Sequence, residues 1–358
     1  MTSQGDRVIN VGFVGCGRAT QMLHLPALRS LEGVEIVGLA DTDPAALERA
    51  ARLVHARHQV LDYRALLDVA TLDAVAICVP AGQHVDVALD VLDAGKHVFI
   101  EKPLALSLED CDRLIARAAT SSSVVMVGFN TRWHRLVQLA RRAVEEGRLG
   151  PLDVVHSILT GHHQTVPDWR KARASGGGAL LEMAMHHFDL WRYLLQAEVD
   201  EVCAYARSGT WDDESATVMA RLSNGVLATA AFAERTVQDN AMEICGQRGS
   251  LSLAFYRFDG LAWRSPRSIP GDGSSRLDAA KRFVTGLPHA VAGLREGGEW
   301  ARSYREQWRQ YLASVRDGAS PGCTLDDGRR ALAVALATIE SASTGRSVRV
   351  ADGATRSA

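Results

Sequence analysis

Short apolar runs alternate with amphipathic helical patterns through the first 130 residues, and this alternation constrains the fold more than any other feature. Runs such as Val34 to Ala40 (VEIVGLA) are apolar almost throughout, which is typical of strands buried on both faces. Strands separated by helices predict right-handed βαβ units and a parallel sheet. The other strands are expected at Val8 to Val14, Asp73 to Val79, His97 to Ile100 and Val124 to Val127, and the helices at Met22 to Leu31, Tyr63 to Ala70, Gln83 to Ala94 and Leu108 to Ala119.

A glycine turn follows the first predicted strand, with the sequence GCGRAT before a helical pattern. This strand, turn and helix arrangement is what a dinucleotide needs. Gly15 permits a tight turn, and Gly17 lets a pyrophosphate approach the backbone. Arg18 and Ala19 open the helix, whose first N–H groups are available to the phosphates. Thr20 stands where a third glycine is usual, so we expect looser packing of this helix against the strand.

The second strand ends at Asp41, about 20 residues beyond the glycine turn, where a carboxylate can bind the ribose hydroxyls of adenosine. A carboxylate there also repels a 2′-phosphate, and the next residue is Thr42 rather than a cation. These residues favour NAD over NADP. An alternative role for Asp41 is the N-cap of a helix that starts near Pro44, although Asp43 is better placed for that cap.

Three polar segments follow the ends of later strands, where ligands of parallel sheets bind. They are Pro80 to His84 (PAGQH), Glu101-Lys102-Pro103, and Phe129-Asn130 with Arg132. A lysine at such a strand end can hydrogen-bond or polarise a substrate oxygen. The X–Pro bond after it is a candidate for the cis form. The alternative is a strand–loop junction with a solvated ion pair, and the two interpretations stay open on these residues alone.

A second candidate for chemistry is Gly176 to Asp189 (GGGALLEMAMHHFD), where three glycines precede a helical pattern. Glu182, His186 and Asp189 fall at i, i+4 and i+7, which places them on one face of a helix. Two acids and a histidine on one face could form a proton-transfer site. The alternative is an amphipathic helix whose polar face meets water.

The remaining chain is richer in strands, several with one apolar face, which predicts an open and mostly antiparallel sheet packed by helices. A linking helix over Trp133 to Gly147 leads into this region. The final segment, Ala351 to Ala358, is expected to be disordered. Strands are predicted at Leu152 to Thr160, Glu201 to Ala206, Ser215 to Leu222, Val226 to Ala233, Ala241 to Gly246 and Ser250 to Phe255, a loop at Ser265 to Ser275, and helices near Glu299 to Arg316 and Leu325 to Thr344.

Charge and cysteine usage narrow the functional classes. A net charge of −2 gives no reason to expect nucleic acid or an anionic membrane as a partner. No run approaches the length of a membrane span, and no signal peptide is predicted. Six scattered cysteines fit reduced thiols in a cytoplasm. His162 and His163 are adjacent, so their side chains diverge, and no metal site is predicted.

Five ordered motifs resemble the glucose–fructose oxidoreductase, inositol dehydrogenase and rhizopine-catabolism family (Gfo/Idh/MocA). They are GCG, AICVPAGQH, AGKHVFIEKPLAL, VGFNTRW and GGGALLEMAMHHFD. The resemblance implies an N-terminal Rossmann domain over residues 1–129. It also implies a substrate-binding and oligomerisation domain over 130–358, whose C-terminal helices are free to pack back on the first domain.

The same resemblance implies residue roles. Lys102 would sit against the oxygen of the reacting carbon, and His186 matches the catalytic histidine. Glu182 departs from the usual Asp by one methylene, which puts the usual sugar specificity in doubt. Asp189 would orient a neighbouring group or stabilise the fold, and Trp169, Arg170 and Asp189 are candidates for substrate contact. The expected cofactor-binding residues are Gly15, Gly17, Arg18, Ala19, Asp41, Val79, Pro80, His84, Glu101, Lys102 and Asn130.

The implied reaction is hydride transfer between NAD and a secondary alcohol or ketone carbon of a sugar, cyclitol or related polyol. We expect a homodimer or homotetramer formed through the C-terminal sheet. Two alternatives stay open. One is an NAD-binding sensor without turnover, and the other is a biosynthetic keto-sugar reductase that prefers NADPH.

Overall fold

The computed structural model describes residues 7–269 and 271–351. The chain divides into two compact units, one formed by Met1–Asn130 with Tyr304–Leu332 and the other by Thr131–Ser303 with Ala333–Ala358. Apart from Ala351, the tail expected to be disordered lies outside the described residues.

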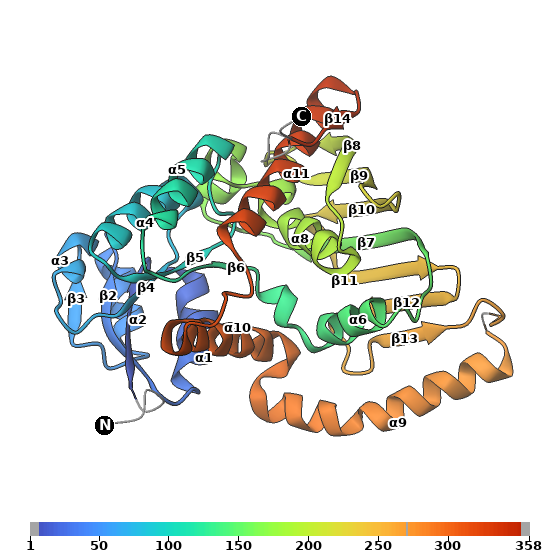
Figure 1. The fold of residues 1–358 in the computed structure, drawn as a ribbon, viewed down its shortest axis with the longest axis horizontal. Coiled ribbons are helices and arrows are strands. Elements are labelled where there is room, and N and C mark those ends of the chain that lie inside the picture. Colours follow the sequence, from blue (N-terminus) through green and yellow to red (C-terminus); the bar gives the residue numbers. More distant parts are fainter. Residues whose placement is uncertain (1–6, 270, 352–358) are drawn as a thin grey trace. The chain divides into compact units, whose positions relative to one another are not determined.

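The first unit contains a six-stranded parallel sheet in the order β3-β2-β1-β4-β5-β6 (Figure 1). The predicted parallel sheet is therefore confirmed. β1 pairs with both β2 and β4, so the strand order reverses there, which is where the ligands of such sheets bind. The short edge strand β3 was not predicted. The strands are β1 (Ile9–Val14), β2 (Val34–Ala40), β3 (His58–Val60), β4 (Ala74–Ile77), β5 (His97–Glu101) and β6 (Val125–Gly128).

The helix after the glycine turn begins as a π-helical turn, η2 (Thr20–His24), and continues as α1 (Leu25–Arg29). Thr20 is fully buried, and its hydroxyl donates a 2.6 Å hydrogen bond to the carbonyl of Gly15. The expectation that Thr20 loosens the packing is wrong, because its hydroxyl ties the helix start to the glycine turn. The other helices between the strands are α2 (Pro44–Ala51), α3 (Tyr63–Leu67), α4 (His84–Asp93) and α5 (Leu108–Ala119).

Residues from far along the chain complete the core of the first unit. Helix α10 (Gly298–Asp317) belongs to this unit from Tyr304 onwards. Its Trp308 and Tyr311 are fully buried. The Trp308 ring stacks on Phe99 of β5, with the ring centroids 4.4 Å apart. The first unit is thus closed by side chains about 200 residues downstream of its sheet.

The second unit contains an eight-stranded sheet in the order β13-β12-β11-β7-β10-β9-β8-β14 (Figure 1). Every pair is antiparallel except β7 with β10, so the predicted mostly antiparallel sheet is confirmed. The strands are β7 (Leu152–His162), β8 (Val199–Arg207), β9 (Ser215–Leu222), β10 (Leu227–Ala233), β11 (Arg235–Gly246), β12 (Gly249–Ala254), β13 (Leu261–Arg264) and β14 (Val348–Arg349).

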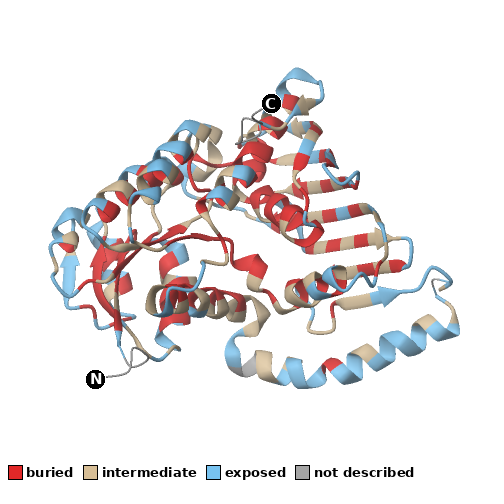
Figure 2. Ribbon diagram, viewed as in Figure 1, coloured by how far each residue is buried: buried red, intermediate tan, exposed pale blue. Residues whose placement is uncertain are grey.

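Helix α8 (Ala184–Leu195) packs on one face of this sheet and is buried over most of its length (Figure 2). The indole N–H of Trp191 donates a 2.9 Å hydrogen bond to the hydroxyl of Ser157 on β7. The Phe188 ring meets Phe232 of β10 edge to face. The helix that carries His186 is therefore anchored rigidly to the sheet. Other helical segments of this unit include α6 (Arg135–Glu145), α7 (Ala179–Glu182) and the second half of α11 (Leu325–Thr344).

The long helix α9 (Gly273–Glu296) was not predicted, and it is mostly exposed (Figure 2). Asp272 caps it and lies inside the segment that was expected to be a loop. Pro288 and the glycines within it obscure its helical pattern in the sequence. Across the described residues, no helix is both long and apolar enough to span a membrane, and no cluster of His, Cys, Asp or Glu could hold a metal ion.

Candidate active site

The glycine turn of the first unit has the geometry that a dinucleotide requires. Gly15 has φ +93°, and a Cβ on it would lie 2.5 Å from the carbonyl oxygen of Cys78 at the end of the neighbouring strand. A side chain is thus excluded at Gly15. A Cβ on Gly17 would meet nothing within 4 Å, so packing does not require this glycine. Access for a ligand to the backbone is the remaining reason for a glycine there.

Asp41 is held against the glycine turn by main-chain groups. Its Oδ2 accepts a 2.6 Å hydrogen bond from the N–H of Cys16, and its Oδ1 accepts a 2.8 Å bond from the N–H of Asp43. The cap of α2 is Asp43, which accepts from the N–H of Ala45 at 2.9 Å. The capping alternative for Asp41 is therefore wrong, and its carboxylate lies beside the turn as the ribose role requires.

His84 was expected to line the nicotinamide, but both of its ring nitrogens face backbone carbonyls. Nδ1 lies 2.8 Å from the oxygen of Pro103, and Nε2 lies 2.8 Å from that of Val79. The side chain is buried, and this burial lowers its pKa. The expected lining of the nicotinamide by this ring stays a prediction, since the geometry shows only that its two nitrogens lie against carbonyls that follow β4 and β5.

Glu101 is the last residue of β5, and its carboxylate is held from two sides. Oε1 lies 2.9 Å from Nε2 of His24, and Oε2 accepts a 3.1 Å hydrogen bond from the N–H of Lys102. Burial raises the pKa of Glu101, whereas His24 and Lys102 lower it. The lowering effects together are larger, so the net shift of the pKa is downward and the carboxyl group is charged. The half-buried Lys102 is joined to Pro103 by a cis peptide bond. Asn130 is buried, whereas Val79 and Pro80 are half-buried.

The segment expected to form one helix in the second unit is split at Met183 into α7 and α8. Glu182 therefore ends one helix, and His186 lies in the first turn of the next. Both side chains are half-buried, whereas Asp189 is fully buried. The prediction of one continuous helix is therefore wrong, and so is the alternative of a polar face that meets water, because Asp189 is fully buried.

His186 and its neighbour His187 lie in different surroundings. Nδ1 of His186 lies 3.5 Å from the hydroxyl oxygen of Thr131. Nε2 of His187 lies 3.1 Å from Oδ1 of Asn240, and burial lowers the pKa of His187 to about 4. His187 is thus a neutral core residue, and His186 is the histidine of this pair that can meet a ligand.

Asp189 forms a buried ion pair with Arg132. Its Oδ2 accepts a 2.7 Å hydrogen bond from Nε of Arg132, and Oδ1 accepts a second one from the same guanidinium. A side chain with 0% exposure cannot touch a substrate. The candidate substrate contact is therefore corrected, and Asp189 ties α8 to the start of the second unit.

Arg170 connects Glu182 to a carboxylate that the sequence did not reveal. Its guanidinium lies 3.8 Å from Glu182 and 3.3 Å from Glu234, which is almost fully buried. Glu234 in turn lies 2.6 Å from Nδ1 of His163. The only signal for Glu234 was a single acid after the apolar strand β10. Trp169, beside Arg170, is 37% exposed and is available for contact.

A Rossmann unit followed by a unit built on a mostly antiparallel sheet is the architecture of a class of two-domain oxidoreductases. Family models agree: residues 9–129 match the model described as "Oxidoreductase family, NAD-binding Rossmann fold", and residues 137–252 match the GFO/IDH/MocA C-terminal domain. Together these matches span well over half of the chain, which belongs to the GFO/IDH/MocA family.

Individual relatives match over almost the whole chain. Myo-inositol 2-dehydrogenase of Thermotoga maritima is 27% identical, covering 96% of this chain and 98% of the relative. Inositol 2-dehydrogenase of Rhizobium meliloti is also 27% identical, with 96% and 99% covered. The WlbA dehydrogenase of Bordetella pertussis, solved with NADH and UDP-GlcNAcA, superposes with a TM-score of 0.81 at 24% identity, covering 97% of this chain and 99% of that one.

Proposed function

We propose that this protein uses NAD(H) to oxidise a secondary alcohol, or reduce the matching ketone, on a cyclitol, sugar or related polyol. The observation that carries the proposal is His186, a half-buried histidine on a rigid helix whose neighbours His187 and Asp189 are committed to the core. The two full-length relatives named above are inositol 2-dehydrogenases, which supports a cyclitol as the first substrate to test.

When bound, NAD supplies or accepts the hydride. In the oxidative direction the substrate hydroxyl must also lose a proton. We assign this proton transfer to the imidazole of His186, whose Nδ1 lies 3.5 Å from the hydroxyl oxygen of Thr131. Lys102, as a cation, would lower the pKa of the hydroxyl and stabilise the developing alkoxide. The two roles could be exchanged, so that a desolvated Lys102 is the base. The variants described below distinguish these two assignments.

Asp41 supports NAD as the cofactor. Its two carboxylate oxygens each accept one backbone N–H, which fixes the negative charge beside the glycine turn. Each oxygen keeps further acceptor capacity for a ribose hydroxyl. A 2′-phosphate at the same place would bring like charges together, so NADP is disfavoured.

Glu182 is proposed to accept a hydrogen bond from a second substrate hydroxyl. Arg170 lies 3.8 Å from it and is itself backed by Glu234, so the Glu182 carboxylate has a positioned guanidinium beside it. A charged acceptor discriminates sharply between substrates that do and do not carry a hydroxyl at that position. Glu182 is thus where we expect the substrate preference of this chain to be set.

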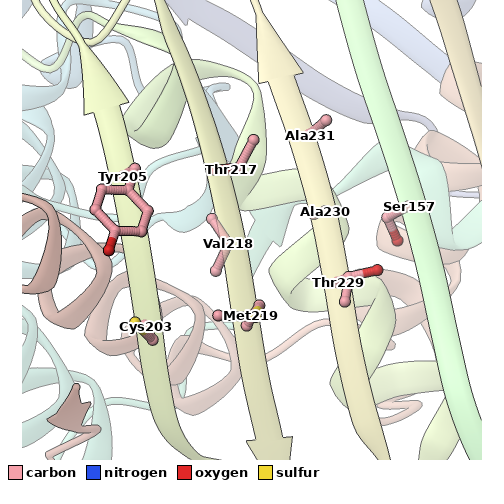
Figure 3. A pocket seen from close by; sticks show the side chains of 9 residues that line it. All are labelled: Ser157, Cys203, Tyr205, Thr217, Val218, Met219, Thr229, Ala230 and Ala231. Carbon is pink, nitrogen blue, oxygen red and sulfur yellow. The ribbon is translucent and has the colours of Figure 1, made fainter. Parts of the chain in front are cut away.

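The other face of the second sheet is proposed to form a homo-oligomer contact, as the family resemblance implies. Tyr205, Thr217 and Ala231 form one cross-strand row, and Cys203, Met219 and Thr229 form the next (Figure 3). Tyr205 and Met219 are exposed there. Met219→Asp should shift the protein to a smaller species in sedimentation.

The cysteines bear on where the protein works. All six cysteines are free, which fits a reducing compartment, and we include a cytoplasmic location in the proposal.

Two variants test the reaction. His186→Ala and Lys102→Ala should each reduce turnover by orders of magnitude and leave NADH affinity largely unchanged, measured by absorbance at 340 nm and by NADH fluorescence. Near-normal turnover in either variant removes that residue from the mechanism. If the base is His186, its variant loses the acidic limb of the pH profile, whereas a Lys102 base predicts that loss in Lys102→Ala. A protein that binds NADH but turns over no polyol in a panel would favour the sensor alternative.

A further inference from the structure

A polar cluster lies inside the otherwise apolar core of the first unit. It consists of His24 at the end of η2, Glu101 at the end of β5, and Trp308 in α10. His24 and Trp308 are both 0% exposed. The roles assigned above use Glu101 but neither His24 nor Trp308. A buried polar network of this kind is stable only if its members satisfy one another.

The hydrogen-bond pattern fixes where the proton of His24 lies. Nε1 of Trp308 lies 3.2 Å from Nδ1 of His24. An indole N–H can only donate, so Nδ1 of His24 must accept. The proton of the neutral ring is then on Nε2, and Nε2 lies 2.9 Å from Oε1 of Glu101. Trp308 thereby places the Nε2–H of His24 on the side of the Glu101 carboxylate.

The hydrogen bond from Trp308 also decides the charge on the His24 ring. Burial lowers the pKa of His24, whereas the Cys78 sulfur and the Glu101 carboxylate raise it, and the net direction is upward. An imidazolium, however, would direct an N–H from Nδ1 at the indole N–H of Trp308, where the structure has a hydrogen bond to Nδ1. We therefore assign the neutral ring, whose Nε2 lies 2.9 Å from Oε1 of Glu101.

The carboxylate of Glu101 is also confined by close packing. A Cβ on Gly128 of β6 would lie 3.0 Å from Oε1 of Glu101, so the glycine makes room for this side chain. Phe99, two residues before Glu101, stacks on the Trp308 ring. The backbone N–H of Lys102 holds the other oxygen. The carboxylate thus accepts the N–H of Lys102 on Oε2, lies 2.9 Å from Nε2 of His24 on the Oε1 side, and has little space in which to rotate.

We propose that His24 and Trp308 are positioning residues that hold Glu101 in one orientation, with its remaining lone pairs set to accept the ribose hydroxyls on the nicotinamide side of NAD. This inference rests on the proposed function, because it assumes that Glu101 meets that ribose. Its physical basis is preorganisation: a carboxylate already fixed by Nε2 of His24 loses little freedom when the cofactor binds. Neither residue needs to touch NAD.

A double-mutant cycle on the full-length protein tests the proposal, with NADH affinity measured by fluorescence. Glu101→Ala should weaken NADH binding about tenfold or more, as expected for losing a charge-assisted hydrogen bond. His24→Leu should weaken it by a similar factor, and the double variant should be no weaker than Glu101→Ala alone. In His24→Leu, the Michaelis constant for NAD should rise by that factor while turnover changes little.

Two milder variants keep the test decisive if His24→Leu fails to fold. His24→Gln keeps a donor near Nε2 and should restore most of the affinity. Trp308→Phe removes the N–H together with part of the ring and should weaken NADH binding a few-fold. Its matched control is Tyr311→Phe, which removes a hydroxyl from the same aromatic core but leaves the hydrogen bonds among Trp308, His24 and Glu101 intact. The control should bind NADH normally.

Two results overturn the inference. One is a double variant in which the losses of NADH affinity caused by Glu101→Ala and His24→Leu add up. The other is a Trp308→Phe variant that is less stable to heat but binds NADH as the control does. A parent protein that binds no NADH would instead refute the proposed function, so the two failures are distinguishable.

Discussion

In the first unit the candidate groups are held mainly by main-chain atoms, whereas in the second unit they are held by other side chains. Asp41 accepts two backbone N–H groups, and His84 faces two backbone carbonyls. By contrast, Glu182 lies against the guanidinium of Arg170, and His186 lies against the hydroxyl of Thr131.

This difference matters because every residue supplies main-chain groups, whatever its side chain. A site held by the backbone keeps its geometry while the surrounding sequence changes, which suits a cofactor shared by many enzymes. A site held by side chains can be rearranged by one substitution. We expect substrate choice in this chain to be altered far more easily than cofactor choice.

The largest effect is expected where a side-chain pair is fully buried. Asp189→Asn removes the charge that pairs with Arg132, and breaking a buried pair this way destabilises a protein by about 3–5 kcal/mol. Denaturant unfolding measures the loss. Glu48→Gln, in the exposed Arg52 pair, is the control and should cause no resolvable change. A loss below about 1 kcal/mol for Asp189→Asn would show that side-chain pairs do not hold the second unit together.

The next effect is on pH dependence. Burial lowers the pKa of His187 to about 4, whereas the unfolded chain keeps the ordinary value of about 6.5. Between about pH 6.5 and pH 4, the unfolded chain therefore binds a proton at this ring that the folded chain does not bind. Stability is therefore fully present above about pH 6.5 and falls as the pH drops, by up to about 3 kcal/mol for this ring. Unfolding at pH 7 and pH 5 measures the slope. His187→Gln should flatten it, and an unchanged slope would show that the ring titrates normally.

Cofactor choice is expected to shift by about tenfold. Asp41→Asn removes the negative charge beside the glycine turn, so the preference for NAD over NADP should fall by about that factor, equivalent to about 1.4 kcal/mol. The ratio of kcat/KM for the two cofactors is the measurement. Asp43→Asn, two residues on, keeps the cap of α2 and should leave the ratio unchanged. If the NAD-to-NADP ratio of kcat/KM is the same in the Asp41→Asn and Asp43→Asn variants, another residue discriminates between the two cofactors.

The smallest effect is expected from shortening Glu182. Glu182→Asp withdraws the carboxylate from Arg170 by one methylene, so KM for the polyol should change a few-fold while NADH affinity stays the same. A panel of epimeric polyols reads out the altered preference. If NADH affinity changes as much as KM, Glu182 acts on more than the substrate.

The first unit could be predicted closely because its signals are local. The observed bounds of β2 and α5 are those predicted, since β2 is one apolar run and Ser107 caps α5 by accepting from the N–H of Asp110. The glycine turn and Asp41 lie within one βαβ unit, so their spacing alone brought them together.

The remaining features depend on contacts between distant residues. Trp308 contacts His24, which lies 284 residues away in the sequence, and Arg170 contacts Glu234, which lies 64 residues away. No periodicity within either segment encodes these pairs. Met183 also breaks the expected helix, although the sequence around it is continuously helical in pattern. These features are determined by tertiary packing, which overrides the structure that the local sequence favours.

The path of the chain has a consequence for synthesis. It leaves the first unit after Asn130 and returns at Tyr304, bringing Trp308 and Tyr311 into a core whose sheet was made much earlier. Domains usually fold as units as they emerge from the ribosome, the earliest first. Here the N-terminal sheet must wait for residues up to Leu332, so strands β7 to β13 of the second unit are made before the older core can close. A nascent chain halted near residue 130 should remain open to proteases and chaperones.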